Sequence, residues 1–301
     1  MSVGDLKREV LVRHLEIWTP GALHKRRAAY VHGGADADGG VLAEAALRVF
    51  AEQSDLVRGR ELTMVAIGED TTEVDRRLGT VGVGNPALTV HVVTGGTDAR
   101  LAATLKAVGA ARVPILGFLD ATTSGRAPEP DTIAAFAAGK PAEVIVGLAP
   151  GAVTDVDGYR SALREAGFPL VAAVELAVGD EPGELLVLAT TQGKSLEAFK
   201  ETLWAVDEFA GVRYRDPGDP ERHLIDISLT PHPGPLRREL LAHLATVGAA
   251  TVTELRTFAL TETVYRAADA TSVLQKLVSS GAVIRTPPAG RLGGDVEIRS
   301  A

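Results

Sequence analysis

From residue 27 to residue 190, short runs rich in Val, Ile and Leu alternate with Ala- and Leu-rich segments of helical periodicity. The apolar runs are almost continuous, which is typical of strands that are buried on both faces of a parallel sheet. Strands that alternate with helices in this way form βαβ units. The alternation therefore restricts this region to an α/β fold with a mainly parallel sheet.

The expected elements follow from this pattern. Strands are expected at Ala28–His32, Leu62–Gly68, Leu88–Thr94, Arg112–Leu119, Glu143–Leu148, Val171–Val178 and Leu185–Thr190. Helices are expected at Leu6–Trp18, Val41–Gln53, Thr71–Thr80, Ala99–Val108, Thr132–Ala138, Gly158–Glu165 and Ser195–Val206. A further strand at Val212–Arg215 would complete a Rossmann-like sheet of the class I methyltransferase type.

A glycine-rich turn follows the first expected strand, in the stretch Tyr30–Gly40. In Rossmann-type domains such glycines let the backbone approach a dinucleotide or S-adenosylmethionine, and the next helix N-terminus favours anionic groups. Gly33 and Gly34 are therefore candidate cofactor-binding residues. Asp36 and Asp38 stand where this turn usually carries glycines or small neutral residues, so a tight βα turn without a ligand is an equal alternative.

Acidic residues follow two other strands. Glu69 and Asp70 end the second strand, where an acid commonly accepts hydrogen bonds from ribose hydroxyls. The same residues also fit a helix N-terminus, with Asp70 or a threonine as the cap. Asp120 ends a central strand and is the candidate catalytic residue, although it also fits an ordinary loop opening. For Gly95–Asp98 we favour a turn in which Thr97 or Asp98 caps the next helix.

Composition excludes several kinds of site. The chain has no cysteine, so it holds no disulfide, no thiolate zinc site and no iron–sulfur cluster. Its seven histidines show no metal-ligand spacing, and we predict no metal site. No apolar run reaches the roughly 18–20 residues of a membrane span, and the charged N-terminal segment lacks a signal-peptide core. We therefore expect a cytoplasmic protein without a membrane partner.

The C-terminal part has a different pattern. The stretch 216–235 is dense in Pro, Gly and Asp and is the expected linker between a domain at 1–215 and a domain at 236–301. Three helical patterns at Leu236–Thr246, Val252–Ala259 and Arg266–Ser279 precede a hairpin-like tail. This order predicts a winged helix-turn-helix domain.

Charge is unevenly distributed along the chain. The net charge is −8, yet residues 231–301 carry eight Lys/Arg against six Asp/Glu. Candidate nucleic-acid contacts are Arg266, Lys276, Arg285 and Arg291, which lie on the expected third helix and wing. Nearby acids and the small side chains of Ala267–Ala270 leave a protein-contact role equally open.

Three segments resemble the three-Cys-motif partner proteins (TcmP), which combine a methyltransferase-like domain with a winged helix. The first runs from Lys7 through Trp18 to the Tyr30–Gly40 turn. The second is the strand Leu185–Thr190 followed by the helix sequence Lys200-Glu201-Thr202-Leu203-Trp204-Ala205-Val206-Asp207. The third is the winged helix, with Leu260–Thr263 before its last helix.

Within the resemblance, the cofactor loop departs from the family pattern. His32 replaces an aspartate, Gly34 replaces a phenylalanine, and Asp36 and Asp38 replace glycines, so the loop looks degenerate. The resemblance implies a partner that carries the three-cysteine motif and is similar to radical-SAM iron–sulfur proteins. We therefore favour an accessory or interaction protein in nucleic-acid metabolism that holds no cofactor.

Two alternatives remain. One is an active S-adenosylmethionine-dependent methyltransferase that acts on nucleic acid, with Gly33, Gly34, Glu69 and Asp70 contacting the cofactor. The other is a DNA-binding regulator whose first domain senses a small ligand. A fold does not by itself decide between these functions.

Overall fold

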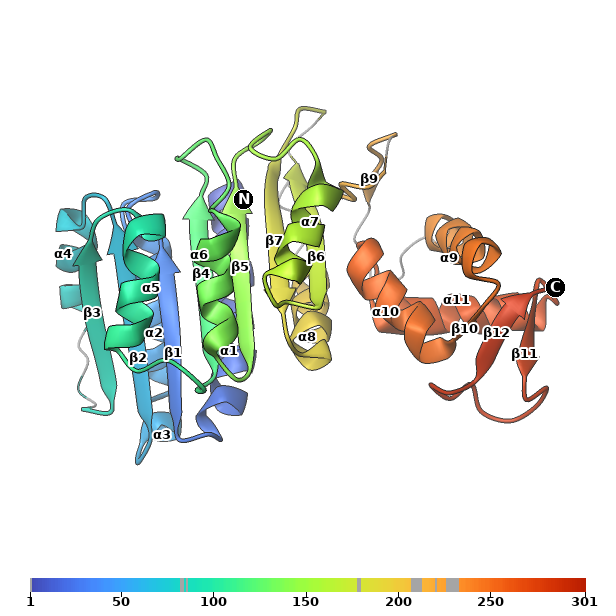
Figure 1. Ribbon diagram of the computed structural model, residues 1–301, viewed down its shortest axis with the longest axis horizontal. Helices are drawn as coiled ribbons and strands as arrows, with labels where there is room; N and C mark the ends of the chain where they lie inside the picture. The colour runs from blue at the N-terminus through green and yellow to red at the C-terminus, as the bar shows by residue number, and fades with distance from the viewer. Residues whose placement is uncertain are drawn as a thin grey trace.

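A computed structural model describes residues 2–301 apart from residues 82, 83, 85, 178, 179, 207–212, 220 and 226–232. The larger part is a nine-stranded sheet with helices on both faces (Figure 1). Its strands are β1 (Arg27–Gly33), β2 (Glu61–Gly68), β3 (Leu88–Thr94), β4 (Ile115–Ala121), β5 (Ala142–Leu148), β6 (Leu170–Ala177), β7 (Glu184–Thr190), β8 (Arg213–Arg215) and β9 (Leu224–Ile225).

The strand order is β3-β2-β1-β4-β5-β7-β6-β8-β9. Neighbours from β3 to β5 are parallel, whereas β7 is antiparallel to both β5 and β6. This order with a reversed β7 is that of a methyltransferase-like sheet, so the expected α/β class is confirmed. The described residues of the strand expected at Val212–Arg215 form β8, and β9, for which no strand was predicted, extends the sheet further through a second antiparallel pair. Val212, the first residue of the expected last strand, lies outside the described residues.

Helices cover the sheet in two layers. One face carries α1 (Val3–Leu23), α2 (Val41–Glu52), α4 (Thr72–Thr80) and α8 (Gly193–Ala205), and the other carries α5 (Thr97–Ala107), α6 (Pro130–Ala134) and α7 (Val156–Glu165) (Figure 1). Short helical segments follow α2 and α6, namely α3 (Ser54–Val57) and the 3-10 turn η1 (Ala135–Ala138). Along β1, Tyr30 joins the core under α1 and α2 while Val31 joins the opposite core. Burial on both faces explains why the strand sequences are continuously apolar.

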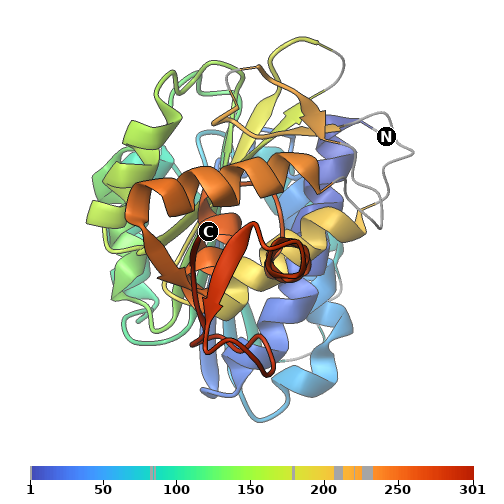
Figure 2. The ribbon, with the colours of Figure 1, turned by 90° about the vertical axis from the view of Figure 1, so that its right-hand side faces the viewer.

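The C-terminal unit has its own small sheet. It contains α9 (Gly234–Val247), β10 (Ala249–Thr251), α10 (Val252–Glu262), α11 (Ala267–Ser279), β11 (Val283–Thr286) and β12 (Glu297–Ser300). The three antiparallel strands lie in the order β10-β12-β11 beside the helices (Figure 2). The three expected helices are present.

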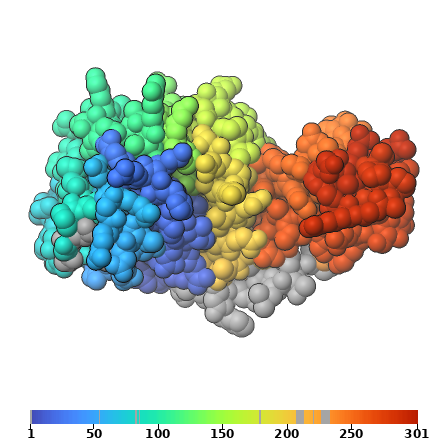
Figure 3. Space-filling view, turned by 90° about the horizontal axis from the view of Figure 1, so that it is seen from below, coloured from blue at the N-terminus to red at the C-terminus, as the bar shows by residue number. Residues whose placement is uncertain are grey.

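The C-terminal unit docks next to α8, as Figures 1 and 3 show. Arg160 on α7 donates to the carbonyl of Thr261, and the buried Lys200 on α8 donates to that of Thr263. The indole Nε1 of Trp204 donates to the carbonyl of Val264 at 3.2 Å. Three side chains thus hold the chain segment at the end of α10, where helix carbonyls lack partners.

Part of the expected linker 216–235 is structured, because β9 lies within it, and its residues 226–232 lie outside the described residues. Within the described part of the chain, no helix is both long and apolar enough to cross a membrane.

Candidate functional site

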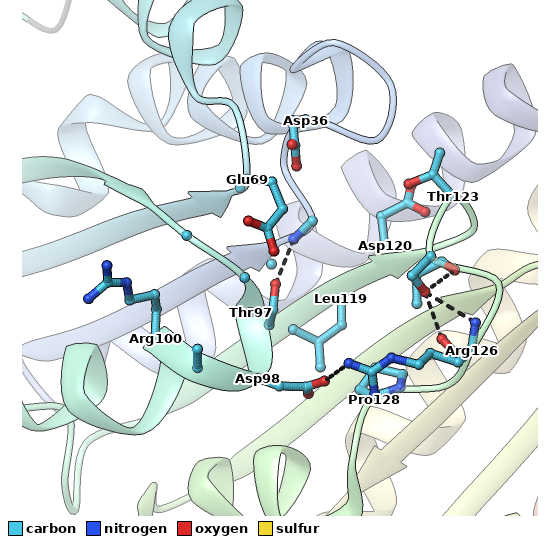
Figure 4. A pocket seen from close by; sticks show the side chains of 18 of the residues that line it. Asp36, Glu69, Thr97, Asp98, Arg100, Leu119, Asp120, Thr123, Arg126 and Pro128 are labelled. Carbon is cyan, nitrogen blue, oxygen red and sulfur yellow. Dashed lines mark hydrogen bonds and ion pairs between the residues drawn. The ribbon is translucent and has the colours of Figure 1, made fainter.

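A pocket opens at the carboxyl edge of the sheet, where ligands bind in open α/β folds. Its volume is ≈ 780 Å³, and the turns after β1, β2, β3 and β4 line it (Figure 4). Parallel strands place these four turns at one edge. The pocket brings together Gly33, Gly34, Glu69 and Asp120 of the residues selected from the sequence, but Asp70 does not line it.

Gly34 closes the end of β1 against β4. A Cβ atom at this position would lie 2.1 Å from the carbonyl oxygen of Asp120, and the φ of Gly34 is +66°. Its backbone N–H donates to Oγ1 of Thr97 at 3.0 Å. Only glycine tolerates this close approach, and its N–H group is already engaged by the chain itself.

The two aspartates of the turn are also engaged by backbone groups. The carboxylate of Asp36 accepts the N–H of Asp70 at 3.0 Å and so bridges the turns after β1 and β2. The carboxylate of Asp38 accepts the N–H groups of Gly40, Val41 and Leu42 at 2.8–3.0 Å. The first turn of α2, which favours an anionic ligand in Rossmann-type folds, therefore holds an anion supplied by the chain.

Glu69 and Asp70 differ in their surroundings. Oδ1 of Asp70 accepts the N–H of Thr72 at 3.0 Å, and this backbone bond holds the pKa of Asp70 below its usual value. Asp70 thus binds the first backbone N–H of α4, whereas the N-cap residue itself is Thr71, which makes no side-chain cap hydrogen bond. Glu69 lines the pocket, and its carboxylate makes no hydrogen bond or ion pair with any described residue.

Asp120 is held in a buried ion pair. Its Oδ2 lies 3.3 Å from Nζ of Lys7, which also lies 2.9 Å from Glu184 Oε2. Only 1% of the Asp120 side chain and 6% of the Lys7 side chain are exposed. Burial opposes the charge of Lys7, but the two carboxylates outweigh it, so the pKa of Lys7 lies above its usual value.

Lys7 is a residue that the sequence interpretation missed. It precedes Val10, Leu11 and His14 by three, four and seven residues and therefore shares the apolar face of α1. A lone lysine on the buried face of a helix indicates a buried carboxylate partner. The spacing of Lys7 from the apolar residues of α1 could therefore have predicted its buried ion pair.

Two histidines are buried between α1 and the sheet, His14 on α1 and His32 on β1. His32 is fully buried, its Nδ1 lies 2.9 Å from the hydroxyl of Tyr30, and its Nε2 has no hydrogen-bond partner in the described structure. Burial lowers the pKa of His32 to about 4, against the opposing influence of Asp38 and Asp120. Nε2 of His14 lies 3.2 Å from Oε2 of Glu143, and both side chains are buried.

The turn after β3 differs from the expectation. Helix α5 begins at Thr97, and its N-cap Gly96 has no side-chain hydrogen bond. Thr97 instead accepts from Gly34, while Asp98 pairs with Arg126 at 2.9 Å and accepts from Thr132 at 2.7 Å (Figure 4). The expected capping by Thr97 or Asp98 is wrong, because both side chains are drawn toward neighbouring turns.

Among the described residues, no group of three or more His, Asp or Glu side chains is arranged to hold a metal ion. The acids of the pocket are separated by their individual partners.

The four basic residues of the C-terminal unit fall into two groups. Arg266 pairs with Asp269 at 3.0 Å and with Glu201 at 3.4 Å, and it stacks over the ring of Trp204 at 4.8 Å. Arg285 donates to four carbonyl groups of the chain between residues 287 and 291. Lys276 and Arg291 are exposed. Two of the four basic side chains, Arg266 and Arg285, thus bind other groups of the chain.

No protein family model matches this chain, and no curated protein matches it. Several solved structures are similar in shape. They include human methyltransferase-like protein 13 in complex with SAH, at 19% identity and a TM-score of 0.40, covering 65% of this chain and 91% of that one.

Two other solved structures are also similar in shape. The Bacillus cereus O-methyltransferase in complex with SAH has 15% identity and a TM-score of 0.40, covering 64% of this chain and 82% of that one. A Pyrococcus horikoshii protein described as an RNA methyltransferase has 17% identity and a TM-score of 0.34, covering 58% and 79%. The fold assignment itself rests on the strand order and directions described above.

Proposed function

We propose that this chain is an accessory or interaction protein, in which a methyltransferase-like domain without methyl-transfer activity is joined to a winged helix. One observation carries the proposal: side chains of this chain already occupy the two places at the carboxyl edge of the sheet where charged groups of a cofactor would bind. Asp38 occupies the first turn of α2, and Lys7 neutralises Asp120. A cofactor with a carboxylate and a cationic centre would have to displace both groups.

Isothermal titration of the purified chain with S-adenosylmethionine and S-adenosylhomocysteine tests this proposal. We expect no binding heat and no thermal shift with either compound. Micromolar binding of S-adenosylmethionine would contradict the proposal, because it would show that the engaged loop still opens for a cofactor.

The second candidate is an active S-adenosylmethionine-dependent methyltransferase acting on nucleic acid. The observation that favours it is that one pocket of ≈ 780 Å³ brings together Gly33, Gly34, Glu69 and Asp120. Pockets of this size suit small-molecule ligands. This candidate predicts that Glu69→Ala weakens S-adenosylmethionine binding, and an unchanged affinity would reject the assignment of Glu69.

For the C-terminal unit we propose a winged helix that contacts nucleic acid or a protein, in keeping with its helices and three-stranded sheet. The exposed Lys276 and Arg291 are the proposed phosphate contacts. Duplex binding measured against salt concentration tests this role, since each phosphate contact contributes about one unit to the slope. Tight, sequence-selective binding would favour a DNA-binding regulator.

The proposed partner is a protein with the three-cysteine motif, similar to radical-SAM iron–sulfur proteins, as the resemblance to the TcmP proteins implies. The absence of cysteine from this chain fits an iron–sulfur cluster carried by the partner. Co-elution with such a protein in gel filtration is the expected result, and separate elution at micromolar concentrations would count against it.

A further inference from the structure

We propose that the amino edge of the large sheet, where β1, β2, β4 and β5 begin, binds the phosphate backbone of a nucleic acid. This edge lies opposite the pocket, and the inference goes beyond the proposed function, because it concerns neither the pocket nor the winged helix. It is based on the charges of the segments that enter and leave these four strands.

The segments that lead into the four strands carry positive charge only. They are residues 24–26, 58–60, 108–114 and 139–141, each between a helical element and its strand. They contain no Asp or Glu and six basic residues, Lys25, Arg26, Arg58, Arg60, Arg112 and Lys140. Arg60 is half-buried, and the other five are exposed.

The segments that leave the same strands at the carboxyl edge carry the opposite charge. Residues 34–40, 69–71, 122–129 and 149–155 contain six Asp or Glu residues and one arginine. The sheet is therefore electrically polarised, although the net charge of the chain is −8. A polyanion that approaches this chain is repelled from the pocket and attracted to the amino edge.

Backbone hydrogen bonds hold the basic segments side by side. The residue after Arg60 donates its N–H to the carbonyl of Arg26 at 2.7 Å. Lys140 donates its N–H to the carbonyl of the residue after Arg112 at 2.8 Å. Since β1 lies between β2 and β4, these four basic residues form a row across three strand spacings, about 14 Å long. Figure 1 shows the four strands beginning at the same lower end, and Figure 3 looks onto that end.

Most of these basic side chains are not neutralised by acids. Arg58 lies 3.8 Å from the exposed Asp55, and Glu61 beside the row pairs with Arg27 at 3.0 Å. Four of the six make no ion pair with any described residue, namely Lys25, Arg26, Arg112 and Lys140. Their charges are available to a ligand.

Helix ends do not account for this arrangement. A cation stabilises a helix C-terminus from within about the last turn, yet α1, α3 and η1, which precede three of the strands, have no basic residue there. Arg26 and Arg112 moreover have φ of +67° and +64°, where glycine would be free of strain. A function of the two side chains explains arginine at such positions better than the backbone does.

Nucleic acid is the polyanion that fits this edge. Guanidinium groups bind phosphate oxygens in pairs, and a row of about 14 Å spans about four phosphates of one strand. Proteins that lie on a membrane surface usually add large apolar side chains to the basic ones. None of the large apolar residues that are exposed among the described residues lies in the four basic segments.

Fluorescence anisotropy of a labelled DNA duplex of roughly 20 base pairs and of single-stranded RNA of equal length, titrated with the full chain, tests the inference. We expect micromolar affinity at low salt for at least one probe. Arg112→Gly should keep the fold, because glycine adopts a positive φ without strain. It should weaken duplex binding about tenfold at about 50 mM salt and reduce the salt slope by about one unit.

Arg222→Gly is the matched control. Arg222 also has a positive φ, +53°, but it pairs with Glu175 near the carboxyl end of β6 at 2.8 Å. Affinity and salt slope should therefore equal those of the wild type. Equal losses in the two variants would overturn the inference, because the location of the charge would not matter.

The remaining outcomes separate this edge from the winged helix and from a membrane surface. No binding of either probe would overturn the inference. A loss in Lys276→Ala with Arg291→Ala, with Arg112→Gly unchanged, would overturn it and leave the winged-helix role standing. Binding to phosphatidylserine vesicles that depends on Arg112, without binding of either nucleic acid, would overturn it in favour of a membrane surface.

Discussion

At the start of α2, the carboxylate of Asp38 lies where Rossmann-type folds favour an anionic group of a ligand. Asp38 accepts three backbone N–H groups there. We predict that Asp38→Ala lowers the free energy of unfolding by about 1–2 kcal/mol, as for other lost helix caps. Asp38→Asn should cost much less, because asparagine also caps helices. Urea unfolding of both variants checks this, and equal losses would show that charge rather than capping is decisive.

His32 gives the molecule a defined acid sensitivity. Burial lowers its pKa from 6.5 to about 4, so the unfolded chain binds more protons than the folded chain between these pH values. Stability contributed by the neutral ring is complete above pH 6.5 and is lost as the pH falls toward 4. The full loss amounts to about 3 kcal/mol.

The test is urea unfolding of the wild type and of His32→Gln at several pH values between 4 and 7. Gln keeps a polar partner for the Tyr30 hydroxyl but has no titrating group. We predict a flatter stability profile for the variant in this window. Identical profiles would mean that another group is responsible for the acid sensitivity.

At the scale of elements, α1 is tied to two strands of the sheet by one lysine. Lys7 bridges Asp120 on β4 and Glu184 on β7. Lys7→Met would leave the buried Asp120 carboxylate without a cation, and we predict a loss of about 3–5 kcal/mol. The double variant Lys7→Met with Asp120→Asn should lose less. Arg8→Met is the control, since the Arg8 side chain is 52% exposed and should contribute less than about 0.5 kcal/mol.

How far the sequence predicts these elements depends on where each element derives its stability. Strands β1 to β7 follow from their own apolar runs, which are long enough to need burial on both faces. Strand β8 coincides with the described residues of the strand expected at Val212–Arg215, whereas β9 was not expected, because a run of two residues acquires strand structure only through its neighbours. Helix α1 extends past the expected Trp18 because Thr19, Ala22 and Leu23 are also buried.

The candidate site was partly predictable for a related reason. The end of each parallel strand can be predicted from its apolar run, so Gly33, Gly34, Glu69 and Asp120 could be placed at one edge of the sheet. The direction of a side chain in a turn cannot be predicted in this way, because Asp36 reaches Asp70 only through the register of β1 against β2. Likewise, Arg266 has the sequence context of a phosphate contact, yet Trp204 and Glu201 of α8, together with the neighbouring Asp269, engage it.

At the scale of the whole molecule, the junction beside α8 explains the helix sequence that carries the family resemblance. Lys200, Glu201 and Trp204 all face the segment that joins α10 to α11. Trp204 lies four residues after Lys200 and three after Glu201, so it is a helix-surface neighbour of both. Asp207, the last residue of that sequence, lies outside the described residues. The described residues of this sequence therefore form a docking surface within the chain.

Arg160 provides the strongest test of this docking. Its side chain is 8% exposed, donates to the carbonyl of Thr261 and pairs with Glu262 at 2.8 Å. We predict that Arg160→Met removes about 2–3 kcal/mol from the docking of the C-terminal unit, because buried hydrogen bonds to charged groups are strong. Small-angle scattering should then show a larger radius of gyration, and calorimetry should resolve two unfolding transitions.

Arg164→Met is the matched control for that experiment. Arg164 lies on the same helix and pairs with the same Glu262 at 2.8 Å, but its side chain is 36% exposed. Water and salt screen such a pair, so the control should keep the radius of gyration of the wild type. If Arg160→Met also kept it and unfolded in a single transition, the carbonyl contacts at the end of α10 would not hold the two units together. The apolar contacts of α10 with β6 and α8 would then carry the docking alone.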